Sequence, residues 1–499
     1  MSSVTPWAPW DTPAPPIDDG PSRGRQWLTI ALVSALIITV GGGGLYWVTA
    51  DRRAKHPHVA AIHYPARWDP RVAKLVSFVQ RTRGLQFEHP VAVRFLSEAA
   101  FKKRVTASPT ALTKSDRADL ANTVAFLRSL GLIAGKTDLF ASVNKATDET
   151  TLAFYDPKDK TITVRGTRLN VAIRVTLVHE MTHALQDQHF DLQHMKRLDH
   201  GDESGAIDAL IEGDATNSEN AYVKTLSTAD KRQYDKETAA QSSGVDLKGV
   251  PPVVQILFDA PYQFGPPFVE VLRANGGEQA VDAAFRHPPT TQEYIYDPTT
   301  YITHDKAEVV ARPAIPGGAK KFDDGKFDPI GWYIVLAEHI DAHEALRATD
   351  GWGGDRYVSY RTREGRVCTR ISFRGETARD TREMQDALQH WIASVPGIVA
   401  NVRGDGTTLR FESCDPGPQA KVATGRSLAA MGLPVGRVSL LQVLLQQGAT
   451  LAVANCVAND VIAQATVAEI NDPNGTSFTS PAGVAHLRSI GLSCRNRFG

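Results

Sequence analysis

The feature that most constrains this 499-residue chain is the run His179-Glu180-Met181-Thr182-His183, which reads H-E-x-x-H. Apolar residues recur at helical spacing from Leu169 to Phe190, so the run is expected inside one buried helix. Positions i and i+4 share one face of an α-helix, and the two imidazoles can therefore approach the same metal ion. Glu180 lies one position round from His179, close enough to reach a water molecule on that ion.

In this pattern the two histidines bind zinc and the glutamate acts as a general base. The alternative interpretation is two core histidines whose nitrogen atoms are satisfied by hydrogen bonds alone. A zinc site needs a third protein ligand, and residues 203–223 are expected to form a second helix. Glu212 lies inside its apolar stretch, where a buried carboxylate favours a nearby cation.

The segment from His179 to Phe190, followed by Glu212-Gly213-Asp214-Ala215, resembles the gluzincins, the thermolysin-like superfamily. More narrowly, it is similar to prokaryotic, envelope-anchored, thermolysin-like metallopeptidases. Asp69-Pro70, Arg83-Gly84-Leu85 and the run 351–357 extend the resemblance over about residues 66 to 370. It implies one catalytic zinc ion held by His179, His183 and Glu212, with Glu180 as the base.

Alternatives remain for the residues around this site. Asp208, one turn before Glu212 on the same face, is the substitute third ligand. Thermolysin-like enzymes place an aspartate four residues after the ligand glutamate to orient a histidine, and Thr216 occupies that position here. Asp187 is the candidate orienting residue instead. Three further histidines are weaker ligand candidates because of their angle on the helix or their polar surroundings: His189, His194 and His200.

Hydrolysis of a peptide bond by a zinc-activated water also requires a hydrogen-bond donor for the developing oxyanion. Four residues are candidates, and the last two are the preferred ones: Tyr296, His304, Arg356 and Tyr357. The glycine-rich run 351–354 would let the backbone approach the site closely. The alternative is a simple turn that leads into a strand.

Two strand-like runs, 152–156 and 161–165, flank a four-residue turn directly before the zinc-binding helix. The resemblance implies that an edge strand here pairs with the extended backbone of a substrate. Such pairing binds peptides without strict sequence choice. A peptide or protein is therefore the expected substrate.

The N-terminal part predicts a membrane anchor. Residues 1–26 are expected to form a Pro-rich disordered tail, and residues 27–49 contain no charged side chain over a length that can span a lipid bilayer. Flanking positive charges slightly favour the reverse orientation, but long domains cross largely regardless of such charges. The four cysteines favour an extracytoplasmic catalytic domain, in the cell envelope, and a cytoplasmic N-terminus.

All four cysteines lie in the last third of the chain, an even number that suggests two disulfides. Cys368 and Cys414 are expected on strands of one small meander, so they are paired. Cys456 and Cys494 belong to one helical segment and form the second pair. Four buried free thiols in a cytosolic protein are the alternative.

The sequence thus predicts an α+β chain: a single N-terminal transmembrane helix, a thermolysin-like zincin core, a small antiparallel α/β meander and a C-terminal helical segment. The expected boundaries are 1–26 for the tail, 27–49 for the span, 56–350 for the metallopeptidase domain, 351–414 for the small sheet with one helix, and 427–499 for the helical domain. Net charge is zero and there is no basic tract, so nucleic acid is not an expected partner. The expected function is a membrane-anchored zinc peptidase, and the alternative is a non-catalytic envelope binding or assembly protein that retains the fold.

Overall fold

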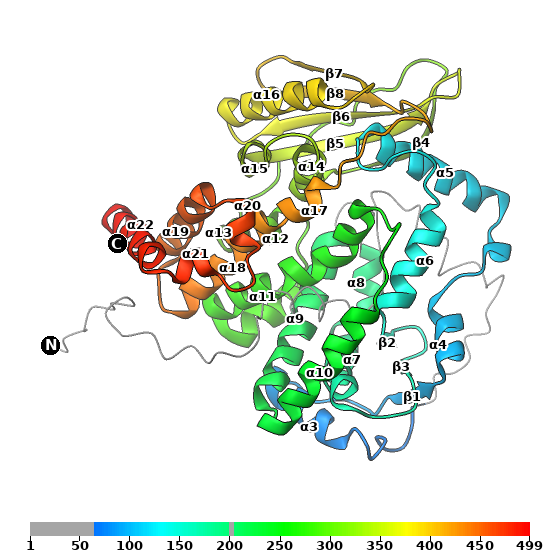
Figure 1. Cartoon of the computed structure of the whole chain (residues 1–499), viewed down its shortest axis with the longest axis vertical. Coiled ribbons are helices and arrows are strands. Elements are labelled where there is room, and N and C mark those ends of the chain that lie inside the picture. The colour runs from blue at the N-terminus through cyan, green and yellow to red at the C-terminus, as the bar shows by residue number, and fades with distance from the viewer. Residues whose placement is uncertain (1–63, 199–203) are drawn as a thin grey trace.

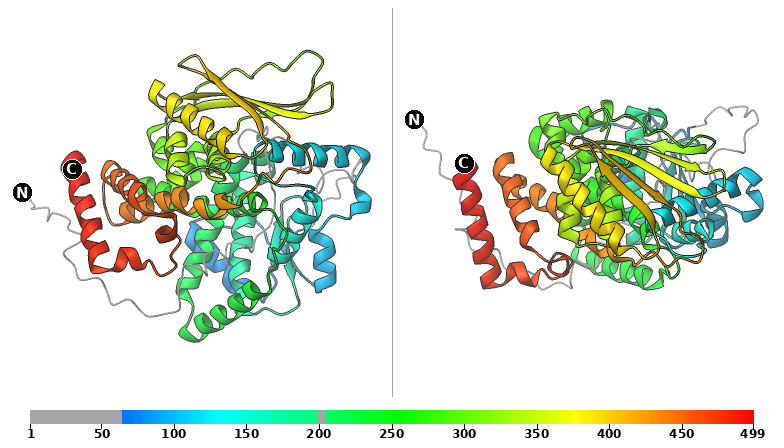
Figure 2. Two further views of the ribbon diagram at one scale, coloured as in Figure 1. Left: turned by 45° about the horizontal axis from the view of Figure 1, so that its top comes forward. Right: turned by 90° about the horizontal axis from the view of Figure 1, so that it is seen from above.

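The computed structural model describes residues 64–198 and 204–499, which form a mixed α+β structure with two small sheets (Figure 1). A five-stranded sheet lies at one end of the molecule and a three-stranded sheet at the other, with helices between them. The C-terminal helices pack as a group beside this body, as the two turned views in Figure 2 also show. The α+β class is therefore confirmed, while the expected transmembrane span, 27–49, falls outside the described residues.

The three-stranded sheet holds the predicted hairpin. Its strands are β1 (Ala92–Leu96), β2 (Ala153–Asp156) and β3 (Thr161–Arg165), in the order β1-β3-β2. β3 pairs in parallel with β1 and antiparallel with β2, so β2 is an edge strand of this sheet. Several short helices surround it: α3 (Ala73–Arg83), α4 (Glu98–Val105), the 3₁₀ turn η2 (Pro109–Ala111), α5 (Lys114–Ser129) and α6 (Leu139–Thr150).

Helix α7 (Val171–Phe190) follows β3 and contains the H-E-x-x-H run. The side chain of Asn170 caps its first turn by accepting from the Ile173 N–H, and Asp191 ends it in the left-handed conformation. Nearly every side chain from Val171 to Asp187 is buried, because the helix lies between the small sheet and other helices. The expected buried helix is confirmed. Three helices come next: α8 (Leu192–Leu198), α9 (Ser204–Thr225) and α10 (Thr228–Gly244).

Helix α11 (Pro252–Arg286) crosses α9 with almost no space between the two backbones. A Cβ atom added to Gly213 of α9 would lie 2.2 Å from the carbonyl carbon of Gly265 in α11. A Cβ on Gly265 would lie 2.2 Å from the Ala209 carbonyl oxygen. Only glycine fits at both positions, and the pair brings the side chains of α11 directly onto α9. A kink at Gly276 and Gly277 separates the last part of α11.

The second sheet forms its own layer with the expected meander. Its strand order is β4-β5-β6-β8-β7, all antiparallel. The helices α14, α15 and α16 lie against it (Figure 1). The elements of this region are α12 (Glu293–Tyr296), α13 (Pro298–Thr303), β4 (Lys320–Gly325), α14 (Asp328–Ala337), α15 (Ala342–Asp350), β5 (Trp352–Arg361), β6 (Val367–Gly375), α16 (Ala378–Ser394), β7 (Val399–Gly404) and β8 (Leu409–Cys414).

The C-terminal segment is helical, as predicted: α17 (Arg426–Ala430), α18 (Gly432–Gln446), α19 (Leu451–Gln464), α20 (Val467–Ile470), α21 (Thr476–Thr479) and α22 (Pro481–Phe498). Both predicted disulfides are present, Cys368–Cys414 across neighbouring strands and Cys456–Cys494 between α19 and α22. Within the described residues, one stretch, Arg426–Gln446, is apolar and long enough to cross a membrane. Much of it packs in the protein core, however, where Leu433, Val438 and Leu441 are buried.

Candidate metal centre

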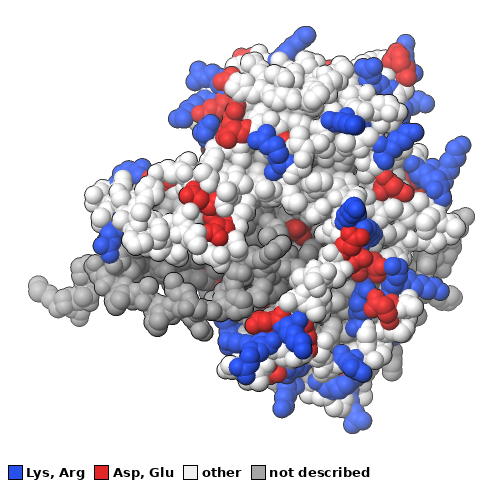
Figure 3. Space-filling model, in the orientation of Figure 1, with Lys and Arg blue, Asp and Glu red and all other residues white. Residues whose placement is uncertain are grey.

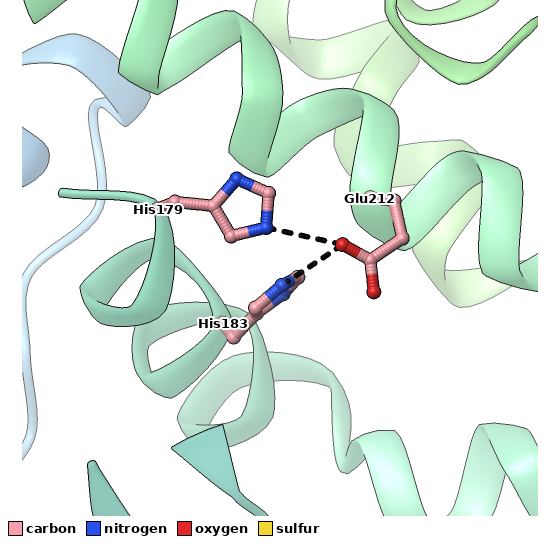
Figure 4. Close-up of side chains that lie close together, drawn as sticks. All are labelled: His179, His183 and Glu212. Atoms are coloured by element: carbon pink, nitrogen blue, oxygen red, sulfur yellow. Dashed lines mark hydrogen bonds and ion pairs between the residues drawn. The ribbon is translucent and has the colours of Figure 1, made fainter. Parts of the chain in front are cut away.

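Two helices bring the three predicted ligands together. His179 and His183 project from α7 toward Glu212 on α9, and all three side chains point at one place (Figure 4). The Nε2 atom of His179 lies 3.1 Å from Oε2 of Glu212, and the Nε2 atom of His183 lies 3.2 Å from the same oxygen. The three potential ligand atoms all lie within 4.8 Å of one another. The helical spacing of the motif and the crossing of α7 and α9 therefore produce one cluster of donor atoms.

This cluster is buried and attracts positive charge. His179 is 1% exposed, and the side chain of Glu212 is 13% exposed. Burial opposes ionisation of Glu212, but His183 and His179 hold the pKa of that carboxyl well below its usual range. Burial also opposes protonation of His179, yet hydrogen bonds to Glu212 and Glu219 raise the pKa of that imidazole to about 10. Two imidazoles and one carboxylate are the donor set that zinc takes in gluzincin-type catalytic sites, so these residues fit a zinc ion.

The other nitrogen of each imidazole has a hydrogen-bond acceptor. The Nδ1 of His179 lies 3.2 Å from Oε2 of Glu219, which is buried on α9, two turns after Glu212. The Nδ1 of His183 lies 3.0 Å from Oε1 of Gln186, one turn further along α7. Once a metal ion displaces the additional proton that the raised pKa keeps on His179, a proton on each Nδ1 leaves both Nε2 lone pairs directed at the cluster, which is the form of histidine that binds a metal.

Asp187 does not orient either histidine, so that prediction is wrong. Its carboxylate accepts hydrogen bonds from the Tyr155 hydroxyl at 2.7 Å, the Lys160 ammonium at 2.5 Å and the Leu192 N–H at 3.1 Å. The reason is helical geometry, because residue 187 lies about 100° further round α7 than residue 186 and so faces the hairpin. Asp187 thus ties the β2–β3 hairpin to the helix that holds the cluster.

Glu180, the predicted base, is 1% exposed and lies beside the cluster on α7. Its Oε2 accepts a hydrogen bond from the backbone N–H of Tyr155 on β2, at 2.7 Å. The contact fixes the carboxylate next to the edge strand of the small sheet. Because Tyr155 directs its N–H at Glu180, its backbone polar groups point away from β3, as do those of Ala153 two residues earlier.

Tyr262 of α11 is a site residue that the sequence analysis missed. Its ring lies 6.2 Å from the His179 ring, centroid to centroid, so the side chain lies against the cluster. Burial and the nearby carboxylates of Glu212 and Glu180 raise the pKa of this phenol well above its ordinary value, so it stays protonated. The Gly213–Gly265 contact is what brings this part of α11 over Glu212. No local signal marks Tyr262, because it lies on a different helix from the motif.

The predicted oxyanion donors lie elsewhere in the fold. Arg356 and Tyr357 are on β5 in the five-stranded sheet, and the Tyr357 hydroxyl donates to Asp323 at 2.8 Å. The hydroxyl of the buried Tyr296 forms a hydrogen bond with that of Thr349, and His304 is the C-terminal cap of α13. Among the weaker ligand candidates, His189 contacts the Gln86 carbonyl oxygen at 2.8 Å, and Asp208 is outside the group that converges on the histidines. A role for Arg356 and Tyr357 in catalysis stays a prediction.

Comparison with known families matches a part of the chain that lies outside the metal cluster. The model of a domain of unknown function, DUF8575, matches residues 273–423, which include the five-stranded sheet and exclude α7 and α9. Neither the curated proteins nor the solved structures contain a match to this chain.

Proposed function

We propose that this protein is a zinc-dependent peptidase anchored in the membrane, with its catalytic domain in the cell envelope. The observation that carries the proposal is the convergence of His179, His183 and Glu212 on one point, with both Nε2 atoms 3.1–3.2 Å from the same carboxylate oxygen. A zinc ion bound there would lower the pKa of a bound water to about 7 and polarise a carbonyl group. Glu180 lies next to His179 on α7.

The protein's own residues then have separate roles in hydrolysis. The Glu180 carboxylate accepts a proton from the attacking water and passes it to the amine that leaves. The Tyr262 hydroxyl, which stays protonated, donates a hydrogen bond to the oxygen of the attacked carbonyl as it gains negative charge. Glu219 and Gln186 keep the two imidazoles in place.

We infer that an extended peptide binds along the edge strand β2, which requires the groups that bury Ala153 and Tyr155 to move aside. Ala153 and Tyr155 direct backbone polar groups away from β3, and Tyr155 contacts the base through its N–H. A peptide that adds to this edge as a further strand would run past Glu180. Main-chain recognition of this kind favours an unfolded segment over a compact protein as substrate.

The location in the envelope rests on the two disulfides, which form in oxidising compartments, together with the uncharged run 27–49. Acidic and basic side chains are interspersed on the face drawn in Figure 3, which offers no continuous basic surface to nucleic acid. A reporter enzyme that is active only after export, fused behind Gly499, should be active. Activity of a cytoplasm-only reporter at that position would overturn the topology.

The test of the activity is hydrolysis of an unstructured protein such as casein by the full chain in detergent, loaded with one zinc per chain. Glu180→Gln keeps the acceptor for the Tyr155 N–H but cannot take a proton, so the rate should fall by about 10²–10⁴-fold with zinc retained. The matched control is Glu338→Gln, which changes an equally buried carboxylate outside the site and should leave hydrolysis unchanged. Equal rates for the wild type and Glu180→Gln would refute the proposal and favour a binding protein in which zinc is structural.

A further inference from the structure

Behind His183 runs a continuous line of polar contacts that reaches three other helices. Gln186 accepts from the Nδ1 of His183 at 3.0 Å, while its Nε2 donates to Oδ2 of Asp214 at 2.8 Å and to the Ile211 carbonyl oxygen at 3.1 Å. The same Asp214 oxygen accepts from Nε of Arg83 at 2.8 Å. We call Gln186, Asp214 and Arg83 the His183 support.

All three members are withdrawn from solvent. Gln186 and Arg83 are 1% exposed and Asp214 is fully buried. The remaining nitrogen atoms of Arg83 contact Glu278 and, at 3.0 Å, Asp282, both on the last part of α11. Burial opposes the charge of Arg83, but these three carboxylates raise the pKa of its guanidinium above the ordinary value. Burying these charges is costly, and their mutual attraction offsets part of that cost.

The side-chain amide of Gln186 lies between Asp214 and His183, and its orientation determines which of its atoms faces the imidazole. An amide can turn either its oxygen or its NH₂ group toward a neighbour, and the two orientations have opposite effects on an imidazole. Both groups on the far side of Gln186, the Asp214 carboxylate and the Ile211 carbonyl, are acceptors. They require the NH₂ group, so the amide oxygen must face His183 and accept a proton from its Nδ1. The Nε2 lone pair of His183 is then free for a metal.

We propose that Asp214, held by Arg83, is a positioning residue that sets the tautomer of the zinc ligand His183 through the orientation of the Gln186 amide. The inference rests on the proposed zinc site. His179 needs no such device, because its partner Glu219 is a carboxylate and accepts a proton in either orientation. The two histidines are therefore supported in chemically different ways.

The proposal is tested by exchanging the carboxylate and the amide between positions 214 and 186. Asp214→Asn is isosteric but allows the Gln186 amide to turn round, and it should speed the release of zinc to a chelator by about 10–100-fold. Gln186→Glu alone places two carboxylates side by side and should also release zinc faster. The double variant Gln186→Glu/Asp214→Asn supplies a carboxylate that accepts from His183 in any orientation and an amide that donates to it. It should recover most of the loss, although the Ile211 carbonyl oxygen loses its donor.

The control is Arg128→Met, which breaks a comparably buried pair with Asp415, far along the chain from the cluster, and should not change zinc release. If Asp214→Asn does not fold, Gln186→Leu can replace it. This variant removes the acceptor for the Nδ1 of His183 and should also speed the release of zinc. The visible spectrum of the cobalt-loaded protein should change in the single variants and return toward the wild type in the double variant.

Two failures can be told apart. A wild-type chain that retains no zinc contradicts the proposed function itself. If the wild type retains zinc and the double variant releases it as fast as the worse single variant, the support acts only through packing, and the tautomer proposal is wrong.

Discussion

The carboxyl group of Asp259 on α11 provides a test of the described packing that does not depend on metal. The side chain is 8% exposed, and its Oδ1 has no hydrogen-bond partner in the described part of the chain. Burial without a compensating cation raises the pKa of Asp259 from 3.8 to about 7. Between these two pH values the unfolded chain loses the proton while the folded chain keeps it, so this group lowers the free energy of unfolding as the pH rises.

The size of the effect follows from the shift. Each unit of pKa difference corresponds to about 1.4 kcal/mol, so a gap of about three units amounts to at most about 4 kcal/mol above pH 7. Asp259→Asn removes the ionisable group. Relative to the wild type, its free energy of unfolding should therefore increase progressively from pH 4 to pH 7 and level off above pH 7.

Urea unfolding of both proteins at pH 4, 5.5, 7 and 8, with a chelator present throughout, measures this difference. Asp386→Asn, at an exposed position of α16, controls for removal of a charge as such. A difference between Asp259→Asn and the wild type that is the same at every pH would show that Asp259 ionises normally in the folded chain and that the described burial is wrong.

Three further predictions concern the site and its frame. Tyr262→Phe should lower kcat by about 10²–10³-fold at unchanged zinc content, because only the donor hydroxyl is lost; steady-state kinetics with a zinc assay checks this. Gly265→Ala should lower the free energy of unfolding by at least about 1–3 kcal/mol and weaken zinc retention, since its Cβ would meet the Ala209 carbonyl oxygen; an unfolding titration measures it. Replacing Cys368 and Cys414 together by serine should cost about 2–4 kcal/mol in the same titration, while leaving the zinc content unchanged.

Much of the site was predictable because it obeys the period of a helix. The i, i+4 spacing places His179 and His183 on one face of α7, and the apolar neighbours of Glu212 predicted its burial. Cys368 and Cys414 were paired from their places on strands of one meander, and they lie directly opposite each other in the register of β6 and β8.

The parts that were missed depend on contacts between elements. Tyr262 reaches the cluster only because Gly213 and Gly265 let α9 and α11 touch, which no local pattern reveals. The choice of Gln186 over Asp187 as a partner of His183 turns on one position along the helix. The glycine-rich run 351–354 has a packing role in the five-stranded sheet, where a Cβ on Gly354 would lie 2.5 Å from the Glu308 carbonyl oxygen.

The most direct test of the central claim is the zinc content per chain of the wild type, Glu212→Ala and Asp208→Ala, purified in parallel and measured by elemental analysis. The structure places the Glu212 carboxylate against both histidines and leaves Asp208 outside that group. We expect about one zinc per chain in the wild type and in Asp208→Ala, and a large loss in Glu212→Ala. Stoichiometric zinc in Glu212→Ala, or none in the wild type, would contradict the metal centre and the peptidase function proposed from it.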